Sequence, residues 1–282
     1  MPKVLTEQQI EHFHSQGFLA AGPVLSPSEV DYYRGRLESF ERKYPDDVRK
    51  LKSKSHLLCP WVEEIARNDN VLDVYEDLIG PNILCYSMAF RTKNPDGKTF
   101  AGWHKDGAAN PIKPILAIGA LALADCTVAH GCLKVIPGSH MDGPLPHIDT
   151  GDPDSILSRG QYISGGFDES KAVNLELKAG EIGIFYAEVI HSSPVNTTDE
   201  RRLILLVEMM PTHTEIRAHR DSGMLVRGVD DFNHVNIDPS PNVEFGPEEL
   251  AAWRHATRET GKNIFEGSPL APTDVYGGQP AE

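Results

Sequence analysis

The chain has 282 residues, of which 40% are hydrophobic, so it is long enough to bury a substantial core. Its 27 basic and 41 acidic residues give a net charge of −14, which argues against a nucleic acid or an anionic membrane as a partner. The longest apolar run, residues 115–124, is half as long as a membrane-spanning helix, and the N-terminus has no apolar signal region. We therefore expect a cytoplasmic protein.

The first part of the chain, about residues 6–80, is predicted to be helical. Thr6 and Gln9 have the spacing of a capping box, and the helix that they start is expected to close at Gly17. The segment 26–29, Ser-Pro-Ser-Glu, repeats this start signal more strongly. Shorter helices are expected at about 60–68 and 71–79, the second one stopped by Gly80-Pro81.

From residue 82 the pattern changes to short apolar or alternating runs that are separated by Gly, Pro, Asn and Asp. Helices come first and strands follow without regular alternation, so a parallel doubly wound sheet is not expected. We predict a mainly β fold, a double-stranded β-helix (jelly roll, cupin-like) over about 82–212, flanked by the N-terminal helices. The runs are NILCYSMAFRTK, ILAIGALALADC, GCLKVIPG, AVNLELKAG, EIGIFYAEVIHSS and RRLILLVEMMP.

Two stretches do not fit this strand pattern. Residues 137–171 are too long and polar for an ordinary connection, which is typical of a lid or of a disordered segment, and we interpret them as a lid. The region of about 213–282 is expected to be irregular, apart from one helix near 246–259. We interpret the whole chain, 1–282, as a single domain. Its four cysteines have no metal-binding or disulfide spacing and are expected to be reduced thiols in the core: Cys59, Cys85, Cys126 and Cys132.

A His-x-Asp pair is a chemical signal, because residues two apart on a strand point the same way and can offer two ligands to one metal ion. Twelve histidines and twenty aspartates give about one such pair by chance, and this chain has four. The surrounding sequence therefore has to show which of the four pairs could bind a metal ion. The pairs are His104/Asp106, His140/Asp142, His147/Asp149 and His219/Asp221.

The pair His104/Asp106 is the best placed, because it lies between two predicted strands at the mouth of the sandwich. His191, at the end of an apolar strand, could complete a 2-His-1-carboxylate site for non-haem Fe(II). Arg202 follows 11 residues later, and its guanidinium suits the far end of a dicarboxylate. The competing interpretation of the pair is two loop residues that bond to the backbone.

Several ordered motifs add to these residues. His104-x-Asp106, "GCLKVIPGSH" at 131–140, "LSRGQ" at 157–161, and the stretch from "LKAGEIGIFYAEVIHSSPVN" to Arg202 resemble the phytanoyl-CoA dioxygenase family of Fe(II)/2-oxoglutarate oxygenases. The similarity covers about residues 6–212 and includes the opening "LTEQQIEHFHSQGFLAAGPVLSPSEV". The chain departs from the family pattern at Gly102-Trp103, where Gln is common, and at His130, where Asn is common.

The resemblance implies roles for individual residues. His104, Asp106 and His191 would be the iron ligands, and Arg202 with Ser193 would bind the distal carboxylate of 2-oxoglutarate. For the near end of this cosubstrate the correspondence offers three candidates on the strand before the triad, of which we rank Arg91 first. The three are Ser87, Arg91 and Lys93.

The implied reaction uses Fe(II), 2-oxoglutarate and O2 to hydroxylate an unactivated C–H bond of a small molecule, with release of succinate and CO2. Related halogenases replace the carboxylate ligand by Gly or Ala, and this chain keeps Asp106. The alternatives are the same oxidant used for desaturation, epoxidation or cyclisation, a non-catalytic jelly-roll binding protein, and a zinc hydrolase on a cupin-like barrel. The fold and the triad do not specify the substrate.

Substrate contacts are expected from Arg159 and Gln161 on the predicted lid, and from Trp103 beside the triad, although Trp103 could equally pack under the sheet. A second metal cluster is not expected, because its candidate ligands lie among Gly and Pro in loops. These candidates are His130, His140 and His147.

Overall fold

Two β-sheets lie face to face in the computed structural model of the chain, which describes residues 2–106, 112–216 and 218–270. The larger sheet has the strand order β1-β8-β5-β10-β2-β12-β13, and the smaller one the order β3-β9-β6-β7. Their neighbouring strands are antiparallel, except for the pair β12 and β13. The prediction of a jelly roll flanked by helices is confirmed.

The helices are α1 (Glu7–Gln16), α2 (Pro27–Lys43), α3 (Pro60–Ala66), α4 (Asp69–Ile79) and α5 (Pro247–Ile264), with 3-10 turns η1 (Pro45–Lys52), η2 (Ser55–Leu57) and η3 (Glu169–Lys171). The strands are β1 (Phe18–Ala21), β2 (Ile83–Lys93), β3 (Ala101–His104), β4 (Ile112–Lys113), β5 (Ala117–Ala122), β6 (Leu133–Val135), β7 (Val173–Leu175), β8 (Ile182–Tyr186), β9 (His191–Ser193), β10 (Arg202–Pro211), β11 (Glu215–Ile216), β12 (Ser222–Arg227) and β13 (Asn236–Ile237).

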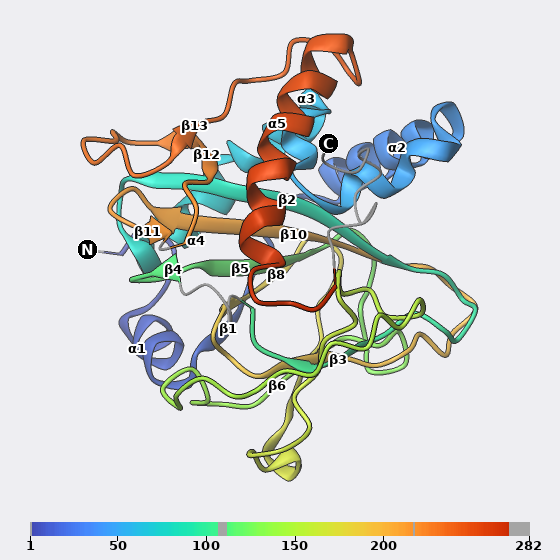
Figure 1. Cartoon of the computed structure of the whole chain (residues 1–282), viewed down its shortest axis with the longest axis vertical. Coiled ribbons are helices and arrows are strands. Elements are labelled where there is room, and N and C mark those ends of the chain that lie inside the picture. Colours follow the sequence, from blue (N-terminus) through green and yellow to red (C-terminus); the bar gives the residue numbers. More distant parts are fainter. Residues whose placement is uncertain (1, 107–111, 217, 271–282) are drawn as a thin grey trace.

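The N-terminal helices begin where the capping signals predict. Thr6 and Ser26 each form a complete capping box, with Gln9 and Glu29 respectively, and Gly17 ends α1 in the left-handed conformation at φ 84°. The helices bury apolar side chains against the outer face of the larger sheet, and Figure 1 shows α2 and α3 on one side of β2 and β10, with β3 and β6 on the other. This layer supports the sheet and leaves its inner face for the site.

The inner face of the larger sheet is set by the pairing of β10 with β2. The register runs from Arg202 opposite Lys93 to Pro211 opposite Ile83, and it shifts by one residue at Tyr86, where β2 carries a β-bulge. Before the bulge, Leu84 points inward, and after it the inward positions become Ser87, Arg91 and Lys93 together with Ala89. The bulge therefore decides which β2 side chains reach the interior.

The chain after residue 212 contains more regular structure than expected. Strand β12 extends the larger sheet beyond β2, because the short apolar run of Ser222–Arg227 completes its ladder. The expected helix is present and reaches Ile264, five residues beyond its predicted end. The expectation of an irregular C-terminal region was therefore wrong for β12, whereas the helix was predicted and only its end lies further along the chain. Residues 271–282 lie outside the described part of the chain.

All four cysteines are free thiols with buried side chains, as the sequence predicts. Among the described residues, no helix has the length and apolar character needed to cross a membrane.

Candidate active site

Two strands of the smaller sheet bring the three predicted metal ligands together. His104 ends β3, His191 begins β9, and these two residues are direct partners in the antiparallel register. Their rings lie 4.0 Å apart, between centroids. Asp106 follows two residues after His104, and its carboxylate oxygens lie 3.6 Å from Nε2 of His104 and 3.5 Å from Nε2 of His191. One ligand atom of each residue lies within 4.8 Å of the others.

Both histidines are oriented by their own backbone. Nδ1 of His104 lies 2.8 Å from the carbonyl oxygen of Gly102, and Nδ1 of His191 lies 3.0 Å from that of Val189. A ring that donates from Nδ1 keeps the lone pair of Nε2 for a metal ion. Burial lowers the pKa of His104 to about 3 and that of His191 to about 4, so both imidazoles are neutral at physiological pH.

The segment that carries Asp106 is held from both sides. The main-chain N–H of Asp106 donates to the carbonyl of Ala187, and that of Lys105 donates to Nε2 of His147. The Lys105 ammonium turns away from the ligands and donates to the carbonyls of Ser139 and Asp142. These bonds fix the carboxylate although its side chain is 30% exposed, more than those of the two histidines.

A second cluster lies where β10 begins. Arg202 donates from Nη1 to the hydroxyl oxygen of Ser193 at 2.5 Å and to the carbonyl of Gly131 at 2.7 Å, and from Nη2 to the carbonyl of Arg91 at 3.0 Å. Lys93 donates to the same Ser193 hydroxyl at 2.6 Å. Ser193 shares a strand face with His191, two residues earlier, so the strand links this cluster to the three ligands.

This cluster brings together two basic side chains, and its contacts among the described residues include no carboxylate. Burial, followed by the neighbouring Arg202, lowers the pKa of Lys93 to about 6, so Lys93 is mainly neutral at physiological pH. Burial lowers the pKa of Arg202 to about 10, so the guanidinium carries the positive charge, and its Nε has no hydrogen-bond partner in the described chain. A buried guanidinium with a spare donor, beside an amine that a carboxylate would help to protonate, suits a carboxylate ligand.

Gly131 makes room for this arrangement. Its φ of +69° is one that glycine adopts without strain, and a Cβ there would lie 2.1 Å from the carbonyl oxygen of Pro194. Its own carbonyl accepts hydrogen bonds from Arg202 and from the Ser193 hydroxyl. The motif Gly-Cys-Leu thus supplies a backbone acceptor that orients the guanidinium.

Both clusters line one pocket between the two sheets, with a cavity volume of about 790 Å³. Residues 151–153 and 155–161 of the predicted lid contribute one wall. This segment is attached to the flanks of β3, because the N–H of Ile156 donates to the carbonyl of Phe100 and that of Ile163 to the carbonyl of Trp103. The long polar loop therefore does cover the pocket.

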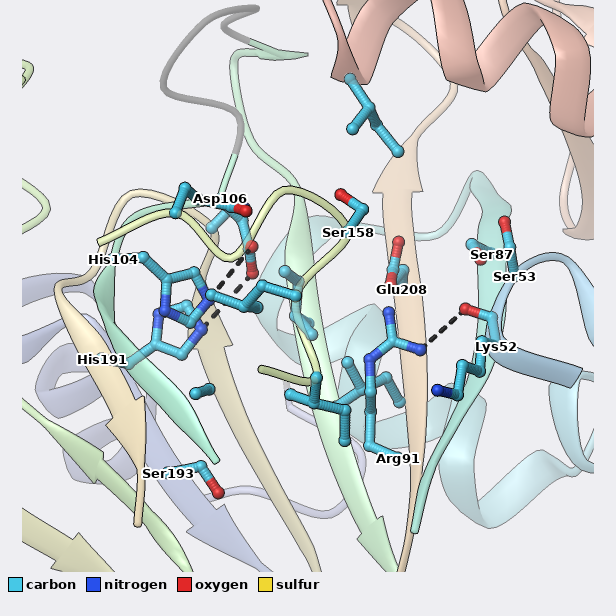
Figure 2. Close-up of a pocket in the computed structure, with 18 of the residues that line it drawn as sticks. Lys52, Ser53, Ser87, Arg91, His104, Asp106, Ser158, His191, Ser193 and Glu208 are labelled. Carbon is cyan, nitrogen blue, oxygen red and sulfur yellow. Dashed lines mark hydrogen bonds and ion pairs between the residues drawn. The ribbon is translucent and has the colours of Figure 1, made fainter. Parts of the chain in front are cut away.

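The first-ranked candidate for the near end of the cosubstrate lies apart from the triad. Figure 2 shows Arg91 on the opposite side of the pocket from His104 and His191, with its guanidinium turned toward Lys52. Nη1 of Arg91 donates to the carbonyl of Lys52 at 2.7 Å. Lys93, proposed from the sequence for the same end, instead contacts Ser193 beside Arg202. Ser87 lines the pocket and accepts a hydrogen bond from the N–H of Lys54.

Of the three expected substrate contacts, two line the pocket. Arg159 lies there with its Nε 3.5 Å from the Asp149 carboxylate, and the side chain of Gln161 accepts a hydrogen bond from the N–H of Arg159. Trp103 does not: it packs edge-on against Phe167 at 5.4 Å. The expectation of a pocket role for Trp103 is corrected, because adjacent strand residues face opposite ways and His104 takes the inward position.

The histidines of the disfavoured second cluster have separate partners. His130 bonds to Thr127, His140 stacks on Tyr186, and His147 accepts from the N–H of Lys105. Within the described ranges, His104, Asp106 and His191 are the group of His, Cys, Asp and Glu side chains close enough to hold one metal ion.

Other pocket residues were not identified from the sequence. Glu208 faces the pocket from β10, and its signal was available as a single acid inside the apolar run "LILLVEMM". The end of α5 also lines the pocket, through Thr260, Asn263 and Ile264. The helix itself was predicted, but no local pattern indicates that it reaches a site formed more than fifty residues earlier in the chain.

Comparisons with known proteins agree with this geometry. The family model for phytanoyl-CoA dioxygenase (PhyH) matches residues 13–204. A phytanoyl-CoA dioxygenase domain-containing protein 1 from Danio rerio is 22% identical over 273 residues, covering 76% of this chain and 92% of the relative. The peroxisomal phytanoyl-CoA dioxygenase of Homo sapiens is 25% identical over 221 residues, covering 69% and 65%.

Comparison with solved structures also finds non-haem iron proteins of the same fold. The non-heme monooxygenase ThoJ, without ligand, has a TM-score of 0.80 and 26% identity over 92% of this chain and 98% of its own. CytC3 with Fe(II) and alpha-ketoglutarate, at 19% identity, supports the fold with a TM-score of 0.62, covering 88% and 98%. The family match spans more than half of the residues and includes both clusters of the pocket. The chain therefore belongs to the phytanoyl-CoA dioxygenase family.

Proposed function

We propose that this protein is an Fe(II)- and 2-oxoglutarate-dependent oxygenase that hydroxylates an unactivated C–H bond of a small molecule. The observation that carries the proposal is the convergence of two neutral imidazoles and one carboxylate in a pocket that also contains Arg202 and Lys93, two buried basic side chains without a carboxylate partner in the described chain. The structures of CytC3 with Fe(II) and alpha-ketoglutarate, and of SnoN with Fe3+ and alpha ketoglutarate, have the same fold.

The residues fit the metal and the cosubstrate. His104, Asp106 and His191 form a donor set of two imidazoles and one carboxylate, which suits Fe(II) and leaves coordination positions open. Bound Fe(II), with 2-oxoglutarate and O2, supplies oxidation of a C–H bond, with release of succinate and CO2. Arg202, Lys93 and Ser193 would hold the distal carboxylate of 2-oxoglutarate by charge-assisted hydrogen bonds.

The protein's own contribution is positioning and exclusion of water. The Nδ1 contacts of His104 and His191 keep each Nε2 aimed at the centre of the site. The lid segment around Arg159 and Gln161 closes one side of the pocket, which shields the reacting groups from solvent and gives these two residues a role in substrate contact. For Arg91 we propose a role on the substrate side, since its guanidinium lies apart from the triad.

Hydroxylation is the main outcome that we propose, and desaturation, epoxidation or cyclisation by the same oxidant would be recognised in the product. Structures of similar fold are described as a monooxygenase, an epimerase and a carbocyclase. We also propose that the chain acts as one catalytic unit, because α5 and the N-terminal helices pack against the same sheet. Four free, buried cysteines support a location in the reducing cytoplasm.

The test combines metal binding with succinate formation. Purified protein should bind about one Fe(II) per chain and form succinate from 2-oxoglutarate in air when a metabolite panel is added. Omission of Fe(II) or exchange of air for nitrogen should stop succinate formation. Succinate formation that is independent of both Fe(II) and O2, or hydrolysis of an added ester with Zn(II) instead, would refute the proposal.

A further inference from the structure

The part of β10 that lines the pocket carries one charged residue at each end. Arg202, Ile204, Leu206 and Glu208 line the pocket from this strand, while the residues between them pack on the helices. Glu208 lies six positions after Arg202, which corresponds to about 20 Å between their Cα atoms at roughly 3.3 Å per residue. A five-carbon dicarboxylate anchored at Arg202 spans only about 7 Å, the length of two extended residues, and does not reach Glu208. Glu208 therefore lies beyond the cosubstrate.

The Glu208 carboxylate has no partner in the described part of the chain. No residue there donates a hydrogen bond to it, and no Lys, Arg or His nitrogen lies within 4.0 Å. Its neighbours across the sheet are Ser87 on β2 and Ile118 on β5. The Arg91 guanidinium is the main opposing charge, but its Nη1 is committed to the carbonyl of Lys52.

An unpartnered carboxylate in such a place is unfavourable without a ligand. Burial, opposed by Arg91 and reinforced by the negative charge of Asp106, raises the pKa of Glu208 to about 7. Retaining a charge there costs free energy that a bound cation recovers. Figure 2 shows the Glu208 carboxylate on the same side of the pocket as Arg91, across from His104 and His191.

Glu208 has apolar neighbours on one side and polar ones on the other. Ile118 and Leu206 flank it on the sheet, and Ile216 and Ile264 line the same pocket, whereas Ser87 and Arg91 lie on the β2 side. Two other acids outside the triad line the pocket, and both have partners: Glu188 pairs with Lys113 at 3.2 Å, and Asp152 accepts a hydrogen bond from the main-chain N–H of Asp154. A ligand with an apolar body and one positive group therefore matches this part of the cavity.

We propose that the substrate carries a cationic nitrogen, such as a protonated amine, and that Glu208 binds it. This inference rests on the proposed function, since it names the substrate class of the same site. Glu208 is a substrate-binding residue in this proposal and takes no part in holding the metal or 2-oxoglutarate.

The experiment uses three probes of similar size: 2-phenylethylamine, 2-phenylethanol and 3-phenylpropanoate. Binding to the full chain, loaded with Fe(II) and 2-oxoglutarate under nitrogen, is measured by isothermal titration calorimetry. The amine should bind at least tenfold more tightly than the alcohol, and the carboxylate should bind most weakly. Glu208→Gln should lower amine affinity at least tenfold and leave alcohol affinity unchanged. Glu188→Gln, a matched control, should keep the amine preference.

Equal binding of amine and alcohol to the unaltered protein, or an amine preference that survives Glu208→Gln, would overturn the inference. The proposed function is judged separately, by Fe(II) retention and by the slow, substrate-independent formation of succinate. The circular dichroism spectrum of Glu208→Gln should match that of the unaltered protein. If the unaltered protein retains no Fe(II) and forms no succinate, the proposed function fails, whatever the probes do.

Discussion

The two ends of the β10 inner face differ in how completely their charges are satisfied. At the Arg202 end, three residues and the Gly131 carbonyl form a closed set of short hydrogen bonds around the Ser193 hydroxyl. At the Glu208 end, the carboxylate has no hydrogen-bond partner in the described chain, and the Arg91 guanidinium is its main opposing charge. A ligand that is the same in every member of a family permits a rigid, prearranged site, whereas the substrate end can vary by single residues such as Glu208.

The largest expected effect comes from removing one ligand of the metal site, which both ends of this wall serve. Asp106→Ala should reduce turnover by about 10³-fold or more, because metal catalysis supplies several kcal/mol of transition-state stabilisation. Iron content by mass spectrometry and succinate formation would measure the loss. The matched control is His219→Ala, which alters another His-x-Asp pair whose histidine contacts Glu266 at the surface. Equal iron content in both variants would refute the ligand assignment.

The Arg202 end can be tested with two adjacent arginines. Arg202→Gln should raise the KM for 2-oxoglutarate by about 10- to 100-fold, since charged hydrogen bonds contribute roughly 1.5–3 kcal/mol each. Arg201→Gln serves as the control, because Arg201 points to the other face and pairs with Glu41. It should cost at most about 1 kcal/mol of stability and leave the KM unchanged. Similar KM values for the two variants would place the carboxylate elsewhere.

The rigidity of the same end depends on Gly131. Gly131→Ala should destabilise the fold by about 1–3 kcal/mol, because φ +69° disfavours other residues and the new Cβ would collide with the Pro194 carbonyl. The displaced carbonyl should also weaken 2-oxoglutarate binding. Urea unfolding and calorimetry would measure the two effects. Undiminished affinity would show that the Gly131 carbonyl does not orient Arg202.

The smallest expected effect concerns the Glu208 end and pH. Because the folded-state pKa of about 7 lies above the unfolded value of 4.5, the protonated carboxyl favours the fold, and this contribution is lost as pH rises through 7. Glu208→Gln has no ionisable group at this position, so its stability does not fall in this way as the pH rises. Between pH 5 and 8 it should gain about 1–2 kcal/mol of stability relative to the unaltered protein, at 1.4 kcal/mol per pKa unit with allowance for the open cavity. If urea titrations give the same pH dependence of stability for Glu208→Gln and for the unaltered protein, the Glu208 carboxylate is not destabilised by its burial.

The features that were predicted correctly from the sequence follow from local patterns. The helix starts at Thr6 and Ser26 follow from capping boxes within four residues. His104, Asp106 and His191 could be nominated because a spacing of two on a strand fixes a common face, and the pairing of β3 with β9 then brings them together.

The parts that the sequence did not predict depend on pairing between distant segments. Lys93 lies beside Arg202 only because β2 and β10 are in this register, and the bulge that sets the register has no clear local signal. Trp103 and the end of α5 are placed by packing across the whole fold. Glu208 was readable as a polar residue in an apolar strand, but its lack of a partner is a property of the assembled pocket.

The bulge at Tyr86 changes which β2 side chains point inward. If β2 kept Tyr86 but alternated regularly, the inward positions after Leu84 would be Tyr86, Met88 and Phe90, and the last two of these now pack beneath the helices. Arg91 and Lys93 would then face the apolar layer under the helices, and their basic groups would be lost from the interior. Deletion of Tyr86 would remove the bulge and still leave Arg91 and Lys93 facing inward, so it is the bulged conformation of this one residue that gives the wall its chemistry.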